Sequence, residues 1–229
     1  KAATWRAAVR RAPRVVVSAD PLGRRFLDKY SFLSPEKVVV ITNGFDPDDF
    51  AAVSAPGREL EAGRFHLTNT GNIEAMFDAR PLLRAIAELV AEDAGLRRDL
   101  LVNLVGTKKG QYEADIGALG IRDRVRYTGW VAHAQSLRYL HQSDALLMCQ
   151  LPHPGGGSEK LSGKCFEYLY LRKPVLCLGV PGITADLLLD SGLGTIVNPD
   201  DIAGIKAALG GLFARRGQPV GADGAGIGG

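Results

Sequence analysis

The sequence contains few side chains of the kinds that bind metals or form disulfides. Its 229 residues include three cysteines and four histidines, and none of them forms a CxxC or HExxH pattern. Cys149, Cys165 and Cys177 lie in apolar surroundings, which is typical of buried, reduced thiols. The histidines are scattered, as structural or surface histidines usually are. We therefore predict no zinc site and no other metal site.

Long apolar runs are also missing. No run of eighteen apolar residues occurs, and the N-terminus lacks the charged-then-apolar pattern of a secretory signal. We therefore expect a soluble protein of the cytoplasm. The net charge of +3 is too small for the whole surface to bind a polyanion, so we expect no nucleic-acid partner. Because 46% of the residues are hydrophobic, the chain can bury one full core, or one core and part of a second.

Acidic residues are absent from the first fourteen positions, which hold five basic ones. Arg6, Arg10 and Arg14 would lie on one stripe of a helix, with Trp5 nearby. Such a stripe could contact anionic lipid headgroups, which would bring the protein to the inner face of the membrane. We favour a simpler interpretation, in which the stripe is the solvated face of a helix from a domain mostly absent from this chain.

The first fifty residues predict too few elements to close a core of their own. We expect strands at residues 15–17 and 38–42, with a helix of about ten residues between them that opens at Asp20 and Pro21. Because the chain begins within a predicted helix, we expect residues 1–50 to be the trailing part of an N-terminal domain. The stretch from 46 to 63 is polar, and we expect residues 51–63 to be a linker. We predict a second domain at 64–215 and a flexible, Gly-rich tail at 216–229.

From residue 65 onward, apolar strand candidates alternate with helical patterns. The clearest helices are predicted at 81–91 and 202–213. This alternation predicts an α/β fold with a doubly wound, Rossmann-like parallel sheet. The strands are continuous apolar runs, as expected where helices cover both faces of a sheet. The six predicted strands are 65–69, 100–105, 125–128, 145–149, 175–178 and 195–197.

Loops that contain glycine follow five of these strands. In a doubly wound sheet the ligand binds beyond the carboxyl ends of the strands. Glycine there lets backbone amides approach a ligand closely, and helix N-termini offer N–H groups that suit a phosphate. For any single loop, ordinary turn chemistry is the simpler explanation. The loops are 70–72, 106–110, 129–131, 150–163 and 179–182.

A helix is predicted from Lys164 onward, with this lysine in its first turn. The helix dipole already makes the potential positive there, so a lysine is locally unfavourable unless it shares an anion with the helix N-terminus. Lys160 adds to the same positive field. A pyrophosphate would satisfy this geometry.

Glu167 follows Lys164 by three positions and lies on the same helix face. A carboxylate beside a phosphate site calls for hydroxyl donors, and the adjacent hydroxyls of a ribose are the simplest such group. An ion pair between the two side chains on the surface explains the pattern equally well.

The passage from Glu159 to Glu167, followed by 173–176 (Lys-Pro-Val-Leu), resembles the Glu-x7-Glu signature of retaining GT-B glycosyltransferases, in the family called glycosyl transferases group 1. Other matches occur in the family's order along the chain. The variant with a lysine before the second glutamate is similar to enzymes that build bacterial surface polysaccharides and glycolipids. The further matching segments are 40–46, which includes Asn-Gly-Phe-Asp at 43–46, then 70–73, 105–106 and 125–131.

The resemblance implies a role for each matching residue. Glu167 would bind the donor ribose, and Glu159 would lie near the donor sugar. Gly71, Asn72 and Lys164 would contact the diphosphate, and the backbone at Trp130 and Val131 would line the base. Glu159 and Lys164 are the implied catalytic pair. The implied donor-binding set is completed by Gly106, Lys108, Lys160 and Leu161.

The implied reaction transfers a glycosyl group from a nucleoside diphosphate sugar to an acceptor hydroxyl with retention, and it needs no cofactor besides the donor. The acceptor would be a glycan or a lipid-linked sugar. Acceptor contacts would lie mostly on the N-terminal domain, so we expect this chain alone to bind donor without efficient transfer. Two departures concern the donor. No basic residue follows the first glycine loop, and the Glu-Gly-Phe-Gly loop common in the family is absent, so the resemblance does not identify the sugar.

Other functions remain as alternatives. A nucleotide-sugar epimerase or hydrolase of the same fold would need its own acid–base pair, and the sequence offers no obvious one. A non-catalytic nucleotide-binding module is also open. A Rossmann dehydrogenase is disfavoured, because no GxGxxG opens the first helix of the predicted sheet.

Overall fold

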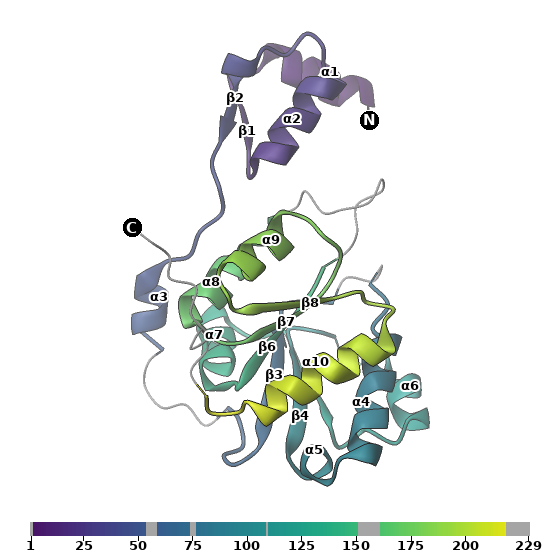
Figure 1. Ribbon diagram of the computed structural model, residues 1–229. Coiled ribbons are helices and arrows are strands. Elements are labelled where there is room, and N and C mark those ends of the chain that lie inside the picture. Colours follow the sequence, from purple (N-terminus) through teal and green to yellow (C-terminus); the bar gives the residue numbers. More distant parts are fainter. Residues whose placement is uncertain (1, 54–58, 74–76, 109, 151–160, 219–229) are drawn as a thin grey trace.

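The computed structural model describes residues 2–53, 59–73, 77–108, 110–150 and 161–218, with side chains described from residue 5. Figure 1 shows a small unit at the N-terminus and a larger unit that contains most of the chain. An extended segment connects them. The elements of the small unit are α1 (Ala2–Arg11), β1 (Val15–Val17), α2 (Asp20–Lys29), the 3-10 helix η1 (Pro35–Lys37) and β2 (Val38–Val40).

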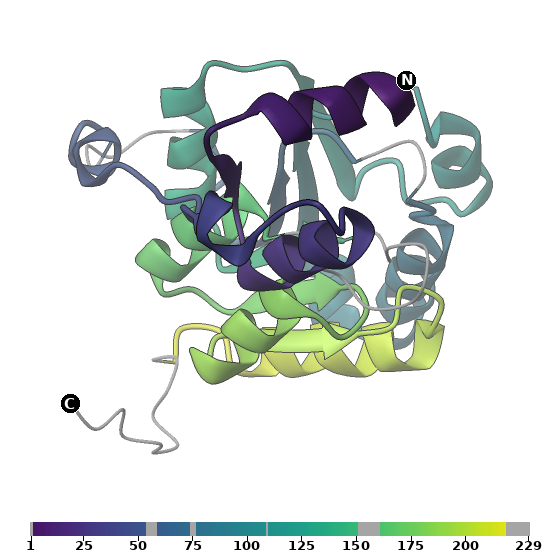
Figure 2. The same cartoon turned by 90° about the horizontal axis from the view of Figure 1, so that it is seen from above.

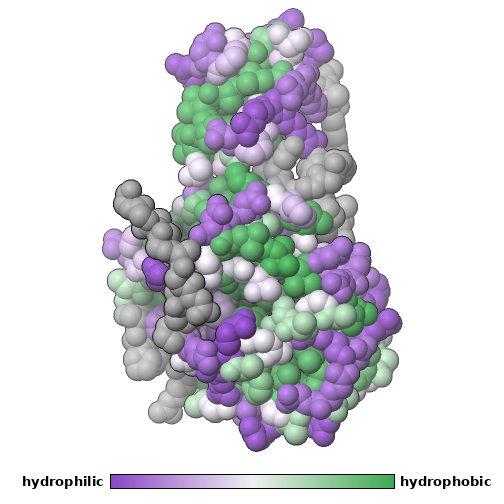
Figure 3. Space-filling view, viewed as in Figure 1, coloured by the Kyte–Doolittle hydropathy of each residue, from purple (hydrophilic) through white to green (hydrophobic). Residues whose placement is uncertain are grey.

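The small unit is a parallel β1–α2–β2 arrangement with α1 packed beside it. Val15 pairs with Val38, and the pairing continues to the ends of both strands. Its apolar cluster contains the buried side chains of Val9, Tyr30 and Leu33. The small unit leaves part of the apolar surface of its two strands uncovered. Figure 3 shows this apolar area over β1 and β2. The exposed apolar side chains there are Val16, Val40 and Ile41.

The predicted basic stripe is shorter than expected. Helix α1 ends at Arg11, so the prediction was wrong for Arg14, which lies beyond the helix. The reason is Pro13, which lacks an N–H and disfavours a helical conformation in the residue before it. Arg6 and Arg10 remain on one face, and their guanidinium groups lie 5.3 and 4.9 Å from the centre of the Phe32 ring. These two arginines therefore pack against the small unit itself.

The stretch predicted to be polar and loop-like contains a helix, α3 (Pro47–Ala51). The Asp46 carboxylate caps it by accepting from the Asp48 N–H at 3.0 Å. Phe50 and Val53 are buried against the larger unit. The Phe50 ring also packs against Tyr170 at a tilt of 42°, with ring centres 4.4 Å apart. These two buried side chains thus fix the end of the crossing to the larger unit.

The larger unit contains a six-stranded parallel sheet in the order β5-β4-β3-β6-β7-β8. Its strand order reverses between β3 and β6, which are hydrogen-bonded neighbours. This is the switch point at which doubly wound sheets bind ligands. Each strand lies within one residue of its predicted bounds. The strands are β3 (Phe65–Thr70), β4 (Leu100–Val105), β5 (Val125–Gly129), β6 (Ala145–Cys149), β7 (Val175–Leu178) and β8 (Gly194–Val197).

Helices cover both faces of this sheet (Figures 1 and 2). One face packs on α4 (Arg80–Glu92), α6 (Glu113–Ala118) and α10 (Ile202–Ala214), with α5 (Ala94–Asp99) beside α4. The other face packs on α7 (His133–Gln142), α8 (Gly163–Leu171) and α9 (Ile183–Asp190). All six residues of β4 are buried, and five of them are apolar, as expected where helices cover both faces of the sheet; the exception is Asn103.

Candidate functional site

Two glycine turns meet at the carboxyl ends of β3 and β4. Gly71 and Gly106 have φ of 80° and 87°, in the left-handed region that favours glycine. A Cβ atom on Gly106 would lie 3.1 Å from the Cα of Gly71, so the two turns approach closely. The Thr107 hydroxyl donates to the carbonyl oxygen of Gly71 at 3.3 Å and links them. The turn at Gly106 therefore restricts the conformation of the turn at Gly71.

Lys164 lies directly against the first glycine turn. A Cβ atom on Gly71 would be 2.7 Å from the lysine Nζ, so any larger residue at position 71 would displace the ammonium from the turn. The same ammonium lowers the pKa of the Cys149 thiol at the end of β6, although burial dominates and raises that pKa to about 12. Lys164 thus sits at the switch point between β3 and β6. It is also in the first turn of α8, where the helix dipole is positive.

A buried tyrosine holds α8 against the sheet at this point. The Tyr168 hydroxyl accepts from the Thr70 N–H at 3.3 Å and donates to the Leu147 carbonyl at 3.1 Å. It therefore bonds to both strands of the switch point, β3 and β6. Since Tyr168 is fully buried one turn after Lys164, it fixes the height and rotation of the helix that carries the site.

The segment that enters α8 is held from two sides. The Asn43 side-chain amide donates to the Leu161 carbonyl at 3.2 Å. The Ser162 N–H donates to the hydroxyl of buried Thr184 in α9 at 3.2 Å. Asn43 belongs to the segment that crosses from the small unit, so the crossing contacts the chain immediately before the site.

Glu167 is half-buried, and its side chain is 20% exposed. Burial raises the pKa of its carboxyl, and the nearby Asp49 raises it further, while His133 and Lys164 lower it. The Nε2 atom of His133 lies 3.7 Å from Glu167 Oε1 and 3.6 Å from Asp49 Oδ2. Lys164 and Glu167 therefore lie close enough to influence one another, as their spacing in the helix predicts.

The structure brings several predicted site residues together and leaves others apart. Gly71, Gly106, Lys164 and Glu167 converge at the carboxyl ends of β3, β4 and β6, and the carbonyl of buried Leu161 holds the entry to α8. Asn72 is exposed directly after the first turn. The predicted residues that lie outside the described part of the chain are Glu159 and Lys160.

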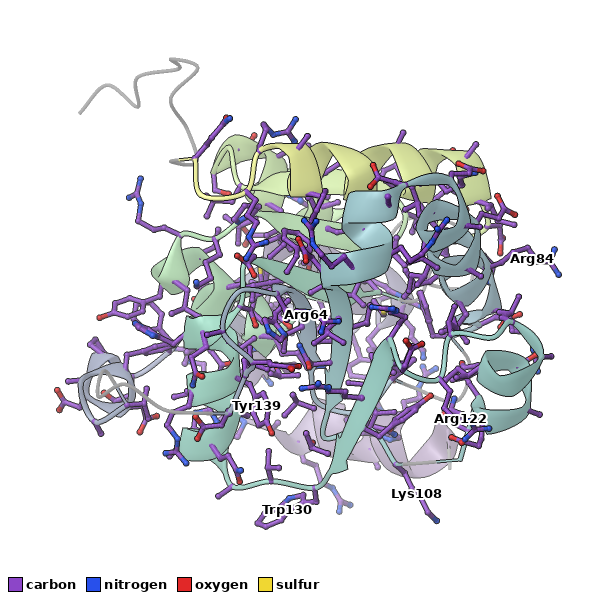
Figure 4. All side chains as sticks on the ribbon, turned by 90° about the horizontal axis from the view of Figure 1, so that it is seen from below. Arg64, Arg84, Lys108, Arg122, Trp130 and Tyr139 are labelled. Carbon is purple, nitrogen blue, oxygen red and sulfur yellow. The ribbon has the colours of Figure 1, made fainter. Side chains whose placement is uncertain are left out.

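The side chains of Trp130 and Lys108 do not converge on this point. Figure 4 shows both projecting outward from the loops after β5 and β4, and Trp130 is 87% exposed. Val131 lines a groove beside α7 together with Thr128 and Gln135. That groove is separate from the contact between Lys164 and Gly71. The prediction for the base concerns backbone atoms near 130–131, and it stays a prediction.

Four further residues at this site could not be identified from sequence patterns. Thr107 and Tyr168 are buried and act through single hydroxyls, which no pattern in the chain singles out. His133 and Asp49 approach Glu167 only because α3, α7 and α8 pack together. In the structure, His133 is the first residue of α7, directly after the glycine loop that follows β5.

Within the described residues, no group of three or more histidine, cysteine, aspartate or glutamate side chains is arranged to hold a metal ion. The same part of the chain contains no helix long and apolar enough to cross a bilayer. Its three cysteines are free thiols.

Residues 64–215 match the family model described as glycosyl transferases group 1, which is more than half of the chain. The chain belongs to this family. As in the sequence prediction, the group 1 domain is an α/β unit with a parallel sheet of the GT-B type. A curated relative, the D-inositol 3-phosphate glycosyltransferase of Geodermatophilus obscurus, is 26% identical over 223 residues. The aligned part covers 91% of this chain and 47% of that protein, so the chain spans about half of its length.

Solved structures share the fold of this group 1 chain. WaaG, a glycosyltransferase involved in lipopolysaccharide biosynthesis, is 22% identical with a TM-score of 0.69, over 93% of this chain and 57% of WaaG. A trehalose-6-phosphate structure from E. coli bound with UDP-2-fluoro glucose is 16% identical with a TM-score of 0.58, over 77% of this chain and 44% of that one. At these identities the likeness establishes the fold, and it confirms the predicted doubly wound α/β architecture.

Proposed function

We propose that the chain is the donor-binding part of a retaining glycosyltransferase that uses a nucleoside diphosphate sugar. The observation that carries this proposal is the position of Lys164, whose ammonium lies against the Gly71 turn at the start of α8. A cation, a glycine turn and a helix N-terminus at one switch point make a site for a diphosphate.

The proposed chemistry follows from that placement. When the bond between the sugar and the diphosphate breaks, negative charge grows on the leaving diphosphate. Fixed cations and amides aimed at it stabilise the transition state more than the ground state. Lys164 and the N-terminus of α8 would supply this stabilisation. The glycosyl group would pass with retention to an acceptor hydroxyl, with Glu159 near the donor sugar.

Glu167 is proposed to hold the donor ribose. It lies one turn along α8 from Lys164 and is half-buried, so hydroxyl donors are the natural partners of its carboxylate. A ribose attached to the diphosphate would reach it. Two charged side chains at the spacing of one helical turn would thus bind the two halves of a nucleoside diphosphate.

The relatives support a nucleotide sugar as donor and a glycan or lipid-linked sugar as acceptor. The E. coli structure holds UDP-2-fluoro glucose, and WaaG is involved in lipopolysaccharide biosynthesis. We propose residues 1–50 as the trailing part of an acceptor domain and 64–215 as the donor domain. Transfer would then need more of the protein than this chain, in the cytoplasm or at the inner face of a membrane.

Calorimetric titration with UDP, GDP, ADP and NADH tests the proposal. One of the nucleoside diphosphates should bind, and it should bind more tightly than NADH. Lys164→Ala should weaken that binding by about 1.5 to 3 kcal/mol, the range for a charged hydrogen bond. Lys206→Ala is the matched control, because Lys206 pairs with Glu88 and Glu92 away from the site. If Lys164→Ala and Lys206→Ala bound the nucleotide with equal affinity, Lys164 would not be part of the binding site.

A further inference from the structure

Three elements present one charged or ionisable side chain each at the outer edge of the site. Asp49 comes from α3, His133 is the first residue of α7, and Glu167 comes from α8. The imidazole Nε2 stands between the two carboxylates, 3.6 Å from Asp49 and 3.7 Å from Glu167. Lys164, one turn before Glu167, completes the charged groups that act on this carboxylate.

The two distances are longer than ordinary hydrogen bonds, so the contact depends mainly on charge. A protonated imidazole attracts both carboxylates, whereas a neutral one leaves them to repel each other. Burial and Asp49 both raise the pKa of the Glu167 carboxyl, and His133 is the first of the groups that oppose them. The imidazole therefore favours the ionised form of Glu167, which is the form that accepts two hydroxyl donors.

We infer that His133 is a positioning residue for the donor ribose: with Asp49 as its second partner, it holds the Glu167 carboxylate ionised and in place to accept both ribose hydroxyls. This inference rests on the proposed function and adds to it a residue on a different helix. His133 itself need not touch the ligand. Its effect reaches the donor through Glu167 alone.

The contribution of the ribose hydroxyls can be separated from that of the phosphates. UDP and 2′,3′-dideoxy-UDP carry the same base and diphosphate, so the ratio of their affinities reports the contacts to the hydroxyls. GDP and its dideoxy analogue replace them if GDP binds more tightly. If Glu167 accepts both hydroxyls, the ratio should be about 10- to 100-fold in the unaltered protein.

His133→Gln should lower that ratio by about 2- to 5-fold at about pH 6, the effect of one partly exposed charge pair. His141→Gln is the matched control, because His141 lies on the same helix at its far end, beside Tyr170. Each ratio is measured on one protein sample, so a change in folded fraction cancels.

A variant that keeps a positive charge distinguishes positioning from a structural role. His133→Lys again places a cation near Glu167, so its ratio should stay closer to that of the unaltered protein than the ratio of His133→Gln does. His141→Gln should keep the ratio of the unaltered protein.

The outcomes separate the two claims. If a nucleoside diphosphate binds and His133→Gln keeps the ratio, or His133→Lys loses as much of it as His133→Gln does, the charge of His133 does not position Glu167, while the proposed function stands. If the ratio is close to one in the unaltered protein, Glu167 does not bind the ribose and the inference is also wrong. If UDP, GDP and ADP all fail to bind, the proposed function and the inference fail together.

Discussion

Replacing Gly71 by alanine tests the site through a single methyl group. The new Cβ would lie 2.7 Å from Nζ and 2.8 Å from Cε of Lys164, so the ammonium must move away from the turn. The end of a lysine side chain moves easily, so this displacement costs little stability. The backbone strain of alanine at φ 80° adds about 1 to 2 kcal/mol. Gly71→Ala should therefore be only moderately destabilised.

Ligand binding should weaken as well, and by more than the backbone strain alone explains. With the ammonium displaced, Gly71→Ala should bind the preferred nucleoside diphosphate at least about tenfold more weakly, comparable to the loss of one charged hydrogen bond. Urea unfolding measures the stability of the variant, and calorimetry measures its affinity. In a Lys164→Ala background the substitution should have a smaller effect on affinity, because no ammonium remains to be displaced.

Gly63→Ala supplies the control for strain. Gly63 has φ 81°, and a Cβ atom there would have no neighbour within 4 Å. It should lose about the same stability as Gly71→Ala and keep its affinity for the nucleotide. Equal affinities of the two variants would refute the account in which the Gly71 turn and Lys164 form one diphosphate site.

Three further predictions concern the fold around the site. Tyr168→Phe should lose about 1 to 3 kcal/mol of stability in urea unfolding, because the Leu147 carbonyl and the Thr70 N–H lose a buried partner. An unchanged midpoint of unfolding would show that this hydroxyl does not fix α8. Burial lowers the pKa of His66 below its ordinary 6.5, so the folded state resists protonation of this ring. The free energy of unfolding should therefore fall as the pH drops from about 7.5 to about 5.5. Constant stability across that range would contradict the claim that the His66 ring is buried in its neutral form. Cys165 and Cys177 are buried, and burial raises the pKa of their thiols to about 11 and about 12, so both should resist a thiol reagent at about pH 8 until the protein unfolds, and fast labelling of both in the native protein would refute this.

Much of the fold could be predicted because the central strands of the larger sheet are almost completely buried. Burial on both faces favours mainly apolar runs, and the strands predicted at 100–105 and 145–149 match the observed ones residue for residue. Lys164 could be singled out because a lysine in the first turn of a helix is electrostatically unfavourable without an anion. Only residues close to Lys164 in the sequence determine this effect.

The remaining features depend on tertiary contacts. Helix α3 was missed because the stretch around it is rich in charged residues, proline and glycine, and the partners of Phe50 and Val53 lie far along the chain. The stripe that included Arg14 failed because Pro13 ends the helix. The contact of His133 with Glu167 joins two helices separated by a strand, and no local pattern encodes it. The Glu-x7-Glu subtype stays a prediction, since Glu159 lies outside the described residues.

The central claim is that a nucleoside diphosphate binds where Lys164 meets the Gly71 turn. The most direct measurement is a crystal structure of the chain with whichever of UDP, GDP or ADP binds most tightly. The account predicts a diphosphate within hydrogen-bonding distance of Lys164 Nζ and of the amides at the start of α8, with the ribose against Glu167. A nucleotide bound elsewhere, for example in the groove beside α7 that Val131 and Gln135 line, would contradict it.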